Sequence, residues 1–150
     1  MLGKAIAIAS EVHELQKDKG GNAYILHPIR LMMRLRTTDE ELMQIAILHD
    51  VIEDSPAWNL NDLTSRGFSE RVVDALELLT HDPKDSYQEY VKRIATNEDA
   101  VRVKIEDLRD NSDITRLKGL REKDLRRMEK YHRAYLFLKK TLENMKDCGY

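Results

Sequence analysis

The sequence predicts an all-α protein, one compact helical bundle that takes up residues 1–150 as a single domain. Apolar residues recur at helical spacing almost throughout, and the alternating runs typical of half-buried strands are missing. The composition agrees, because 41% of the residues are hydrophobic and 35% are charged, as in helical globular proteins. A chain of 150 residues is long enough to bury a substantial core.

The first third of the chain contains two predicted helices separated by a turn. Periodicity predicts the first helix over about 2–17, and the turn-forming residues 19–22 close it. The second helix begins at His27-Pro28, because proline fits the first turn of a helix, where its missing N–H is not needed. Its apolar side continues to Leu35.

The third predicted helix is the most apolar one. Thr38 is the expected N-cap, and Glu41, three residues later, would complete a capping box. We expect the helix to run without interruption to about Asp54, because Pro56 prevents it from continuing much further.

Five more helical segments are expected in the rest of the chain. A short helical turn covers 61–65, and Ser69 caps a fourth helix. Ser86 caps a fifth helix, and a sixth covers about 100–113. The last helix, 122–146, is expected to pack on the bundle through an apolar side made of Leu125, Met128, Tyr131, Tyr135, Leu138 and Leu142.

Composition and charge exclude several classes of function. No apolar run approaches the roughly 20 residues that cross a bilayer, and residues 1–10 are followed at once by Glu11, which favours an amphipathic helix over a signal peptide. The net charge of −2 leaves no basic footprint for a nucleic-acid polymer but permits a small anionic ligand. The single cysteine, Cys148, cannot form an internal disulfide, which agrees with a cytoplasmic location.

The end of the third predicted helix concentrates groups that bind metals. His49 and Asp50 are adjacent, and Glu53 and Asp54 follow one turn later. The carboxyl end of a helix already carries partial negative charge, so clustered carboxylates there need a positive group to offset them. A divalent metal is the simplest candidate, and a metal beside spare carboxylates indicates hydrolysis. The alternative is a core histidine followed by a solvated acidic helix end.

Two other segments offer compatible groups. Lys104, Asp107 and Asn111 are spaced i, i+3 and i+7, so they share one face of the sixth helix. That face is either functional or a solvent-exposed polar stripe, because an apolar stripe on the same helix competes for the inward position. His27 stands directly before Pro28, where it is either a metal ligand at a rigid helix entrance or a surface histidine.

These segments together offer two imidazoles and two carboxylates, from His27, His49, Asp50 and Asp107. That donor set suits one ion of manganese, iron, cobalt or zinc. Competing chemistries are weaker, since the sequence has neither a glycine-rich phosphate loop followed by lysine-serine/threonine nor a serine in a nucleophile elbow.

Three stretches carry a resemblance to a known family. They read YILHPIR at 24–30, AILHDVIED at 46–54 and VKIED at 103–107, with Asn111 following. In this order they resemble the HD-domain metal-dependent phosphohydrolases. More narrowly, they resemble the hydrolase domain of the RelA/SpoT-type guanosine tetraphosphate (ppGpp) enzymes and their short stand-alone relatives. The resemblance covers about 5–117, and an ordered set of three stretches is far more specific than a lone His-Asp pair.

The resemblance implies an HD-domain bundle that hydrolyses the 3′-diphosphate of ppGpp with a divalent metal, and it favours manganese. The implied metal ligands are His27, His49, Asp50 and Asp107. Glu53 and Asp54 are the implied acidic pair that handles the hydrolytic water. Nucleotide contacts are implied for Lys19, Lys104 and Asn111.

Four positions depart from the family's pattern. The family commonly has an arginine that lies against the guanine where this chain has Asp18. The proline usual before the tyrosine is Ala23, and Asp113 and Ile114 replace an arginine-threonine pair. The departures leave the implied metal ligands whole and leave the preference for guanine open.

Several functions therefore remain in competition. A phosphorylated nucleotide is the expected small-molecule substrate, with ppGpp first and NADPH or a deoxynucleotide phosphate as the alternative. A metal- or nucleotide-binding sensor with little turnover is a second class, which the altered positions favour. A plain helical interaction domain with incidental histidines and acids is a third. The sequence indicates no membrane or nucleic-acid partner and leaves the oligomeric state open.

Overall fold

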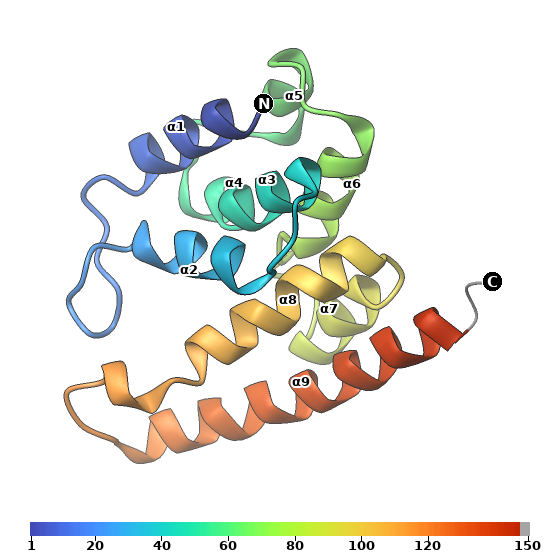
Figure 1. Ribbon diagram of the computed structural model, residues 1–150. Helices are drawn as coiled ribbons and strands as arrows, with labels where there is room; N and C mark the ends of the chain where they lie inside the picture. The colour runs from blue at the N-terminus through green and yellow to red at the C-terminus, as the bar shows by residue number, and fades with distance from the viewer. Residues whose placement is uncertain (148–150) are drawn as a thin grey trace.

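The computed structural model describes residues 1–147, and every regular element among them is helical (Figure 1). The predicted all-α class is confirmed, while Cys148 lies outside the described residues. In chain order the elements are α1 (Leu2–Val12), α2 (Leu26–Arg34), α3 (Glu40–Leu48), α4 (Val51–Asp54), α5 (Leu60–Ser65), α6 (Glu70–Leu79), α7 (Tyr87–Ile94), α8 (Glu98–Asn111), the 3-10 turn η1 (Ile114–Arg116) and α9 (Glu122–Asp147).

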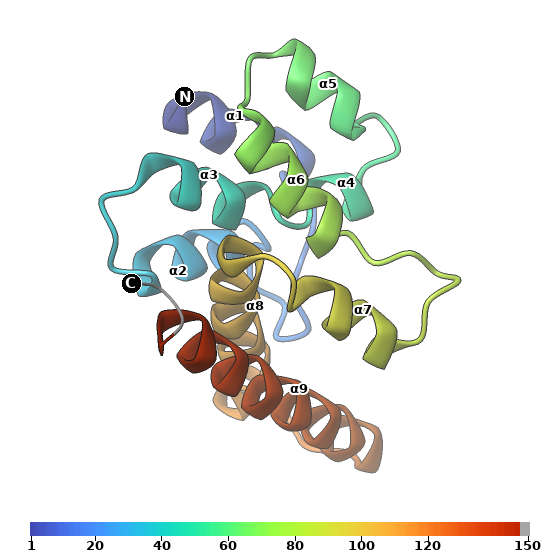
Figure 2. The ribbon, with the colours of Figure 1, turned by 90° about the vertical axis from the view of Figure 1, so that its right-hand side faces the viewer.

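Helix α3 lies at the centre of the bundle. Its residues Ile45, Ala46, Ile47 and Leu48 are completely buried, because α1, α2, α6 and α8 pack around it. Figure 2 shows α1, α5 and α6 on one side of α3, α2 and α8 on the other, and α9 outermost. A helix covered on all sides is apolar all round rather than amphipathic. The apolar run that ends at Leu48 therefore carries the following residue, His49, into the interior.

Side-chain caps begin several helices, as predicted for two of them. The Ser69 hydroxyl accepts a backbone N–H at the start of α6, and Ser86 forms a capping box at the start of α7. The prediction of Thr38 as the cap of α3 is wrong by one residue. The Asp39 carboxylate accepts the first N–H groups instead, and its negative charge also favours a helix N-terminus.

The predicted unbroken helix to Asp54 is also wrong, because His49 and Asp50 separate α3 from α4. The His49 Nδ1–H donates to the carbonyl of Ala46 at 2.8 Å. In a continuous helix that carbonyl would accept the N–H of Asp50, four residues on. A side chain thus takes the place of the backbone donor, and helical bonding resumes from Asp54 N–H to Asp50 O at 2.9 Å.

Helix α1 ends at Val12, several residues earlier than predicted, and an ordered loop follows. The Asp18 carboxylate accepts the N–H groups of Gly20 and Asn22, both at 2.9 Å. Gly21 has φ +87°, a left-handed conformation that glycine adopts without strain. The Gln16 carbonyl accepts the N–H of Tyr24 at 2.9 Å, and Lys17 pairs with Ala23, so the residues after His13 bond across this loop instead of continuing the helix.

Helix α8 is buried on more than one side. It begins two residues earlier than predicted, with Asn97 as its cap. Val101 and Leu108 belong to the apolar core, and Asp107, from the polar face, is only 5% exposed. The alternative of a solvent-exposed polar stripe on this helix is therefore wrong.

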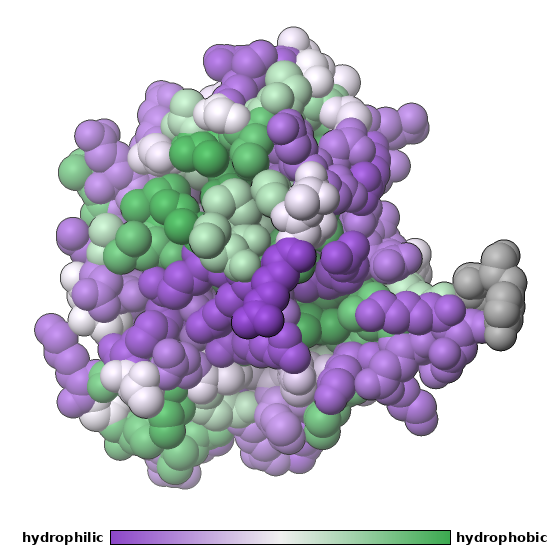
Figure 3. Space-filling model, viewed as in Figure 1, coloured by the Kyte–Doolittle hydropathy of each residue, from purple (hydrophilic) through white to green (hydrophobic). Residues whose placement is uncertain are grey.

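Helix α9 packs along α8 at the outside of the bundle (Figure 1). Its inward side buries Ala134 and Leu138, whereas Leu125, which we expected on that side, is 57% exposed. On the face shown in Figure 3 hydrophobic colour gathers over α1 and α2, and hydrophilic side chains cover most of the rest. Within residues 1–147 no helix combines the length and hydrophobicity needed to cross a bilayer.

Candidate metal centre

His27, His49, Asp50 and Asp107 meet where α2, the α3–α4 junction and α8 come together. The Nε2 atoms of the two histidines are 3.3 Å apart. Asp50 Oδ2 lies 2.9 Å from His49 Nε2 and 3.8 Å from His27 Nε2. Asp107 Oδ1 lies 3.1 Å from His27 Nε2 and 3.7 Å from His49 Nε2. In the described part of the chain, His27, His49 and Asp50 are the one metal-ligand group whose donor atoms all lie within 4.8 Å of one another.

Hydrogen bonds at the outer ring nitrogens orient both imidazoles. His49 Nδ1 faces the Ala46 carbonyl at 2.8 Å, and His27 Nδ1 faces the Asp110 carboxylate at 2.7 Å. Both acceptors require a proton on Nδ1, so each neutral ring directs its Nε2 lone pair into the cluster. Two lone pairs 3.3 Å apart, beside two carboxylates, repel one another unless a cation or proton lies between them. The donor set therefore fits a divalent metal ion.

The pKa shifts in the cluster also indicate that it attracts positive charge. Burial would lower the pKa of His49, but the carboxylates of Asp50 and Asp107 outweigh it and raise that pKa well above its usual value. Burial would raise the pKa of Asp50, but the two imidazoles lower it to about 2. Two ionised carboxylates that attract a proton to an imidazole attract a metal cation for the same reason.

Asp110 is the orienting residue that sequence reasoning missed. Its carboxylate is completely buried, and besides His27 it accepts two hydrogen bonds from Arg30, at 2.8 and 2.9 Å. Arg34 and Arg116 lie 3.0 and 3.4 Å from it. Burial would raise the pKa of Asp110, but these partners hold it well below its usual range. A carboxylate behind a ligating histidine fixes the ring and strengthens it as a ligand.

Tyr24 was quoted only as part of the matching stretch, yet it contacts the cluster directly. Its hydroxyl donates to Asp50 Oδ2 at 2.5 Å, and its ring packs between those of His13 and His27. Burial and the neighbouring Asp50 raise the pKa of Tyr24 far above its usual value, so the hydroxyl stays protonated and keeps donating. Tyr24 thus fixes the rotamer of one carboxylate in the cluster.

The acidic pair Glu53 and Asp54 lies on the short helix α4, and the two carboxylates contact different segments. Glu53 accepts the backbone N–H of His81, in the loop after α6. Asp54 accepts a hydrogen bond from Gln16, in the loop after α1, at 3.0 Å. Partial burial raises the pKa of Glu53, although its carboxylate still reaches solvent. The negative charge of Asp50 raises that pKa further.

Lys104 and Asn111 both contact Asp107. Lys104 Nζ donates to Oδ2 and Asn111 Nδ2 to Oδ1, each at 2.7 Å. Lys104 also lies over the Tyr90 ring, 5.0 Å from its centroid. The i, i+3, i+7 spacing therefore places Lys104 and Asn111 on either side of the Asp107 carboxylate, where each bonds one of its oxygens. The implied nucleotide contacts of these two residues stay predictions.

Comparison with known proteins bears on this cluster. No protein-family profile matches the chain. The guanosine-3′,5′-bis(diphosphate) 3′-pyrophosphohydrolase of Aquifex aeolicus is 35% identical over 118 residues, 72% of this chain and 17% of that protein. The bifunctional (p)ppGpp synthase/hydrolase SpoT of Escherichia coli is 33% identical over 134 residues, 84% of this chain and 19% of that protein. The chain is a relative of the RelA/SpoT-type enzymes.

The predicted resemblance to the RelA/SpoT-type enzymes is thus confirmed, and a third protein agrees with it. The guanosine-3′,5′-bis(diphosphate) 3′-pyrophosphohydrolase of Vibrio cholerae is 41% identical over 56 residues, 35% of this chain and 8% of that protein. The chain spans less than a fifth of the length of these relatives. The similarity therefore concerns one segment of each of the larger proteins.

In this RelA/SpoT relative a cavity of about 360 Å³ opens beside the cluster, and we call it the metal-side cavity. His27 forms part of its wall, and the predicted nucleotide contacts Lys19 and Asn111 line it. Lys104, Glu53 and Asp54 are not part of its lining. Its walls consist of Gln16, Lys17, Asp18, Lys19, Gly20, Tyr24, His27, Asn111, Asp113, Arg116, Leu117 and Tyr131.

The positions that depart from the RelA/SpoT pattern have local structural roles. Asp18 closes its own loop and lies 3.3 Å from Arg116, which brings a guanidinium into the metal-side cavity from another segment. Gly20 packs so closely on Arg116 that an added Cβ would lie 2.4 Å from the Arg116 carbonyl oxygen. Asp113 caps η1, and Ile114 is half exposed. None of these residues contacts the four candidate ligands.

Proposed function

We propose that this chain is a metal-dependent phosphohydrolase and that it removes the 3′-diphosphate of ppGpp, releasing GDP and pyrophosphate. One observation carries the proposal: two Nε2 atoms and two carboxylates, from three separate segments, face a common point beside a cavity. The names of the relatives from A. aeolicus and E. coli supply the substrate and the reaction.

The proposed metal ligands are His27, His49, Asp50 and Asp107, and manganese is the proposed ion. A bound divalent ion would polarise a phosphoryl oxygen and lower the pKa of water. Asp110 and the Ala46 carbonyl would keep the two imidazoles aimed at it, and Tyr24 and Lys104 would hold the carboxylates.

Glu53 is the proposed general base. Its raised pKa makes its carboxylate a better proton acceptor than an ordinary surface glutamate, and the backbone N–H of His81 orients it. Asp54 would assist from the other side of α4, where Gln16 holds it.

Cations in and near the metal-side cavity would offset the charge of the diphosphates. Lys19 is exposed at this cavity and would meet a phosphate there, while Arg116 is less exposed and lies close to the carboxylates of Asp18 and Asp110. We keep Lys104 and Asn111 as proposed nucleotide contacts that act together with their bonds to Asp107.

A second candidate substrate follows from Asp18. A carboxylate stands at the position where the family commonly has the arginine that lies against guanine, and this favours testing other bases. NADPH or a deoxynucleotide phosphate is therefore the alternative substrate.

The test is a panel of ppGpp, NADPH and a deoxynucleoside triphosphate with added Mn²⁺, with released pyrophosphate and phosphate measured separately. The proposal expects pyrophosphate and GDP from ppGpp, no product with EDTA, and release slowed about 100-fold or more in the Glu53→Gln variant. Phosphate release from NADPH alone would move the proposal to the alternative substrate. Tight nucleotide binding without product over hours would favour a sensor and contradict the enzyme assignment.

A further inference from the structure

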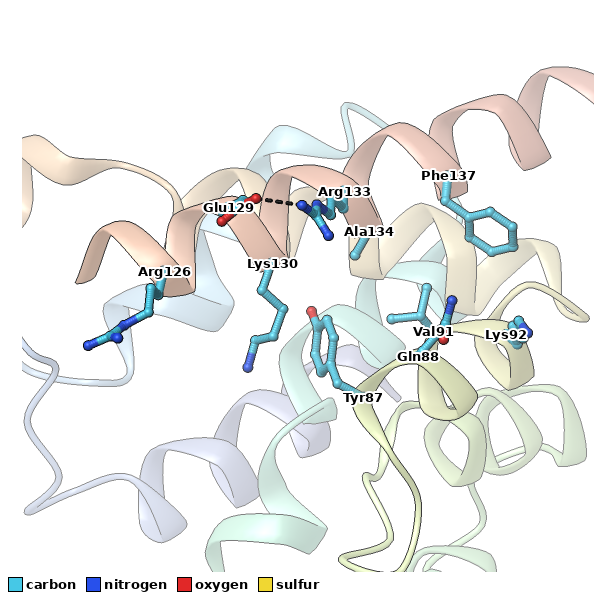
Figure 4. Close-up of a pocket in the computed structure, with 10 residues that line it drawn as sticks. All are labelled: Tyr87, Gln88, Val91, Lys92, Arg126, Glu129, Lys130, Arg133, Ala134 and Phe137. Carbon is cyan, nitrogen blue, oxygen red and sulfur yellow. Dashed lines mark hydrogen bonds and ion pairs between the residues drawn. The ribbon is translucent and has the colours of Figure 1, made fainter. Parts of the chain in front are cut away.

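A second hollow, of about 490 Å³, lies between α7 and α9, and we call it the α7–α9 groove (Figure 4). Val91, Ala134 and Phe137 give one end an apolar floor. Arg126 and Lys130 lie toward the other end, with the Tyr87 ring beside Lys130. The groove therefore offers a single ligand an apolar surface at one end, with Lys92 beside it, and the side chains of Arg126 and Lys130 at the other end.

The charge of the groove is opposite to that of the whole chain. Its lining holds four cations, Lys92, Arg126, Lys130 and Arg133, and one carboxylate, Glu129, whereas the chain has a net charge of −2. Glu129 is 2.5 Å from Arg133 and neutralises that arginine, and Glu122, which is not part of the lining, lies 3.5 Å from Arg126 in an exposed ion pair. Among residues 1–147 no carboxylate lies within 4.0 Å of Lys92 or Lys130. A local excess of cations in a concave site attracts anions.

A buried hydroxyl supplies an independent sign of a ligand. Tyr87 lines this groove, and its hydroxyl, which is shielded from solvent, has no hydrogen-bond partner within the described residues. Buried polar atoms are nearly always paired, so an unpaired one indicates a missing partner. Burial raises the pKa of Tyr87 to about 12, so the hydroxyl remains available as a donor.

The groove is separate from the metal-side cavity but shares a wall with it. Lys130 Nζ lies 4.4 Å from the centre of the Tyr87 ring and 5.5 Å from that of Tyr131. Tyr87 faces the groove, Tyr131 lines the metal-side cavity, and the two rings are 6.3 Å apart. An anion that draws Lys130 away from these two rings would change the surroundings of Tyr87 in the groove and of Tyr131 in the metal-side cavity.

We propose that the α7–α9 groove is a second nucleotide-binding site, with the phosphates at Arg126 and Lys130 and the base against Phe137. Arg126 and Phe137 are eleven positions apart on α9, about 16 Å along the helix axis. That span suits a nucleoside diphosphate, whereas inorganic pyrophosphate would reach only the cationic end. An acidic peptide is a poorer fit because the apolar floor occupies one end only. The site requires no metal and does not depend on the proposed hydrolysis.

The test is calorimetric titration of the full chain in EDTA with GDP, ADP and inorganic pyrophosphate. We expect the double variant Arg126→Glu/Lys130→Glu to weaken GDP and pyrophosphate binding at least about tenfold, because both ligands lose charged contacts. Phe137→Ala should weaken GDP and ADP binding and leave pyrophosphate binding unchanged. Lys139→Glu, an exposed site on the same helix outside the groove, is the matched control and should bind as the parent does.

Three results would overturn the proposal. GDP and ADP fail to bind at millimolar concentration, while circular dichroism shows the protein folded. Lys19→Glu abolishes nucleotide binding and the double variant does not, which would place the nucleotide in the metal-side cavity. An acidic peptide binds in an Arg126-dependent way while GDP does not.

Discussion

Two clusters in this protein gather carboxylates from distant segments, and they differ in how far side-chain cations balance the negative charge. At the surface, Arg71 joins Asp39 and Glu41 of the α3 start and Asp99 of α8, at 2.7, 3.1 and 2.7 Å. In the interior, Asp50 and Asp107 face two imidazoles whose remaining ring nitrogens are already bonded. The chain fills the first cluster with a guanidinium, whereas in the second Lys104 contacts one oxygen of Asp107 and no side-chain cation from the described residues lies between the two imidazoles.

The difference separates a structural cluster from the proposed metal site. Exposed ion pairs contribute little stability each, and the Arg71 cluster serves to tie α3, α6 and α8 together. The interior cluster is buried, and its like-charged carboxylates stay ionised at a cost in repulsion and desolvation.

Glu53→Gln should have the largest effect among the variants that sharpen this contrast. Loss of a general base lowers kcat by about 100- to 10,000-fold, while the metal should remain bound because glutamine disturbs none of the four ligands. Steady-state kinetics with ppGpp together with metal analysis of the same preparation measure both quantities. Full activity in this variant would remove Glu53 from the mechanism.

Asp110→Asn tests whether the orienting carboxylate matters to the interior cluster. Asparagine cannot hold the His27 ring with the same charge, so Mn²⁺ affinity should fall by about 10- to 100-fold. Titration with Mn²⁺, followed by calorimetry or thermal shift, gives the affinity. Asp113→Asn is the control, because this nearby carboxylate caps η1 and does not contact His27. Equal losses in both variants would mean that the effect is general.

Arg71→Ala should have a smaller effect, on stability and not on metal binding. Removing the built-in cation of the surface cluster should lower the free energy of unfolding by about 1 kcal/mol or less, since all partners are partly solvated. Chemical denaturation measures this change, and Mn²⁺ affinity should not change. A loss of metal binding in this variant would show that the two clusters are not independent.

The pH dependence of that variant gives the smallest effect. The Arg71 hydrogen bonds lower the pKa of Asp39 below its usual 3.8. The contribution of the Asp39–Arg71 interaction to the free energy of unfolding is therefore fully present above about pH 4. It is lost as the pH falls through the lower pKa that Asp39 has in the folded protein. The stability difference between the parent and Arg71→Ala should shrink over that acidic range. A difference that stays constant down to pH 2 would contradict the assignment of the interaction to Asp39.

Sequence patterns predicted the parts of the fold that local chemistry determines. The caps Ser69 and Ser86 and the apolar run into α3 depend on neighbouring residues, and they appear as expected. The break at His49 was missed because it depends on a side chain taking the Ala46 carbonyl inside a packed core. Periodicity alone cannot show such a competition between a backbone and a side-chain donor.

The sequence indicated the four proposed metal ligands, but it did not indicate the residue that orients one of them. His27, His49, Asp50 and Asp107 were proposed from residue type, order and resemblance, and the structure brings all four side chains together. Asp110 was missed because its partners, His27 and Arg30, are about 80 positions away in the sequence. A possible signal was its place one turn after Asp107, on the same side of α8.

The most direct measurement is an anomalous difference map from crystals soaked in Mn²⁺. The account predicts one peak within about 2.5 Å of Nε2 of both histidines, 27 and 49, and of an oxygen from each of the aspartates 50 and 107. Crystals that show those four side chains in place with no peak between them, while manganese occupies another position, would contradict the account.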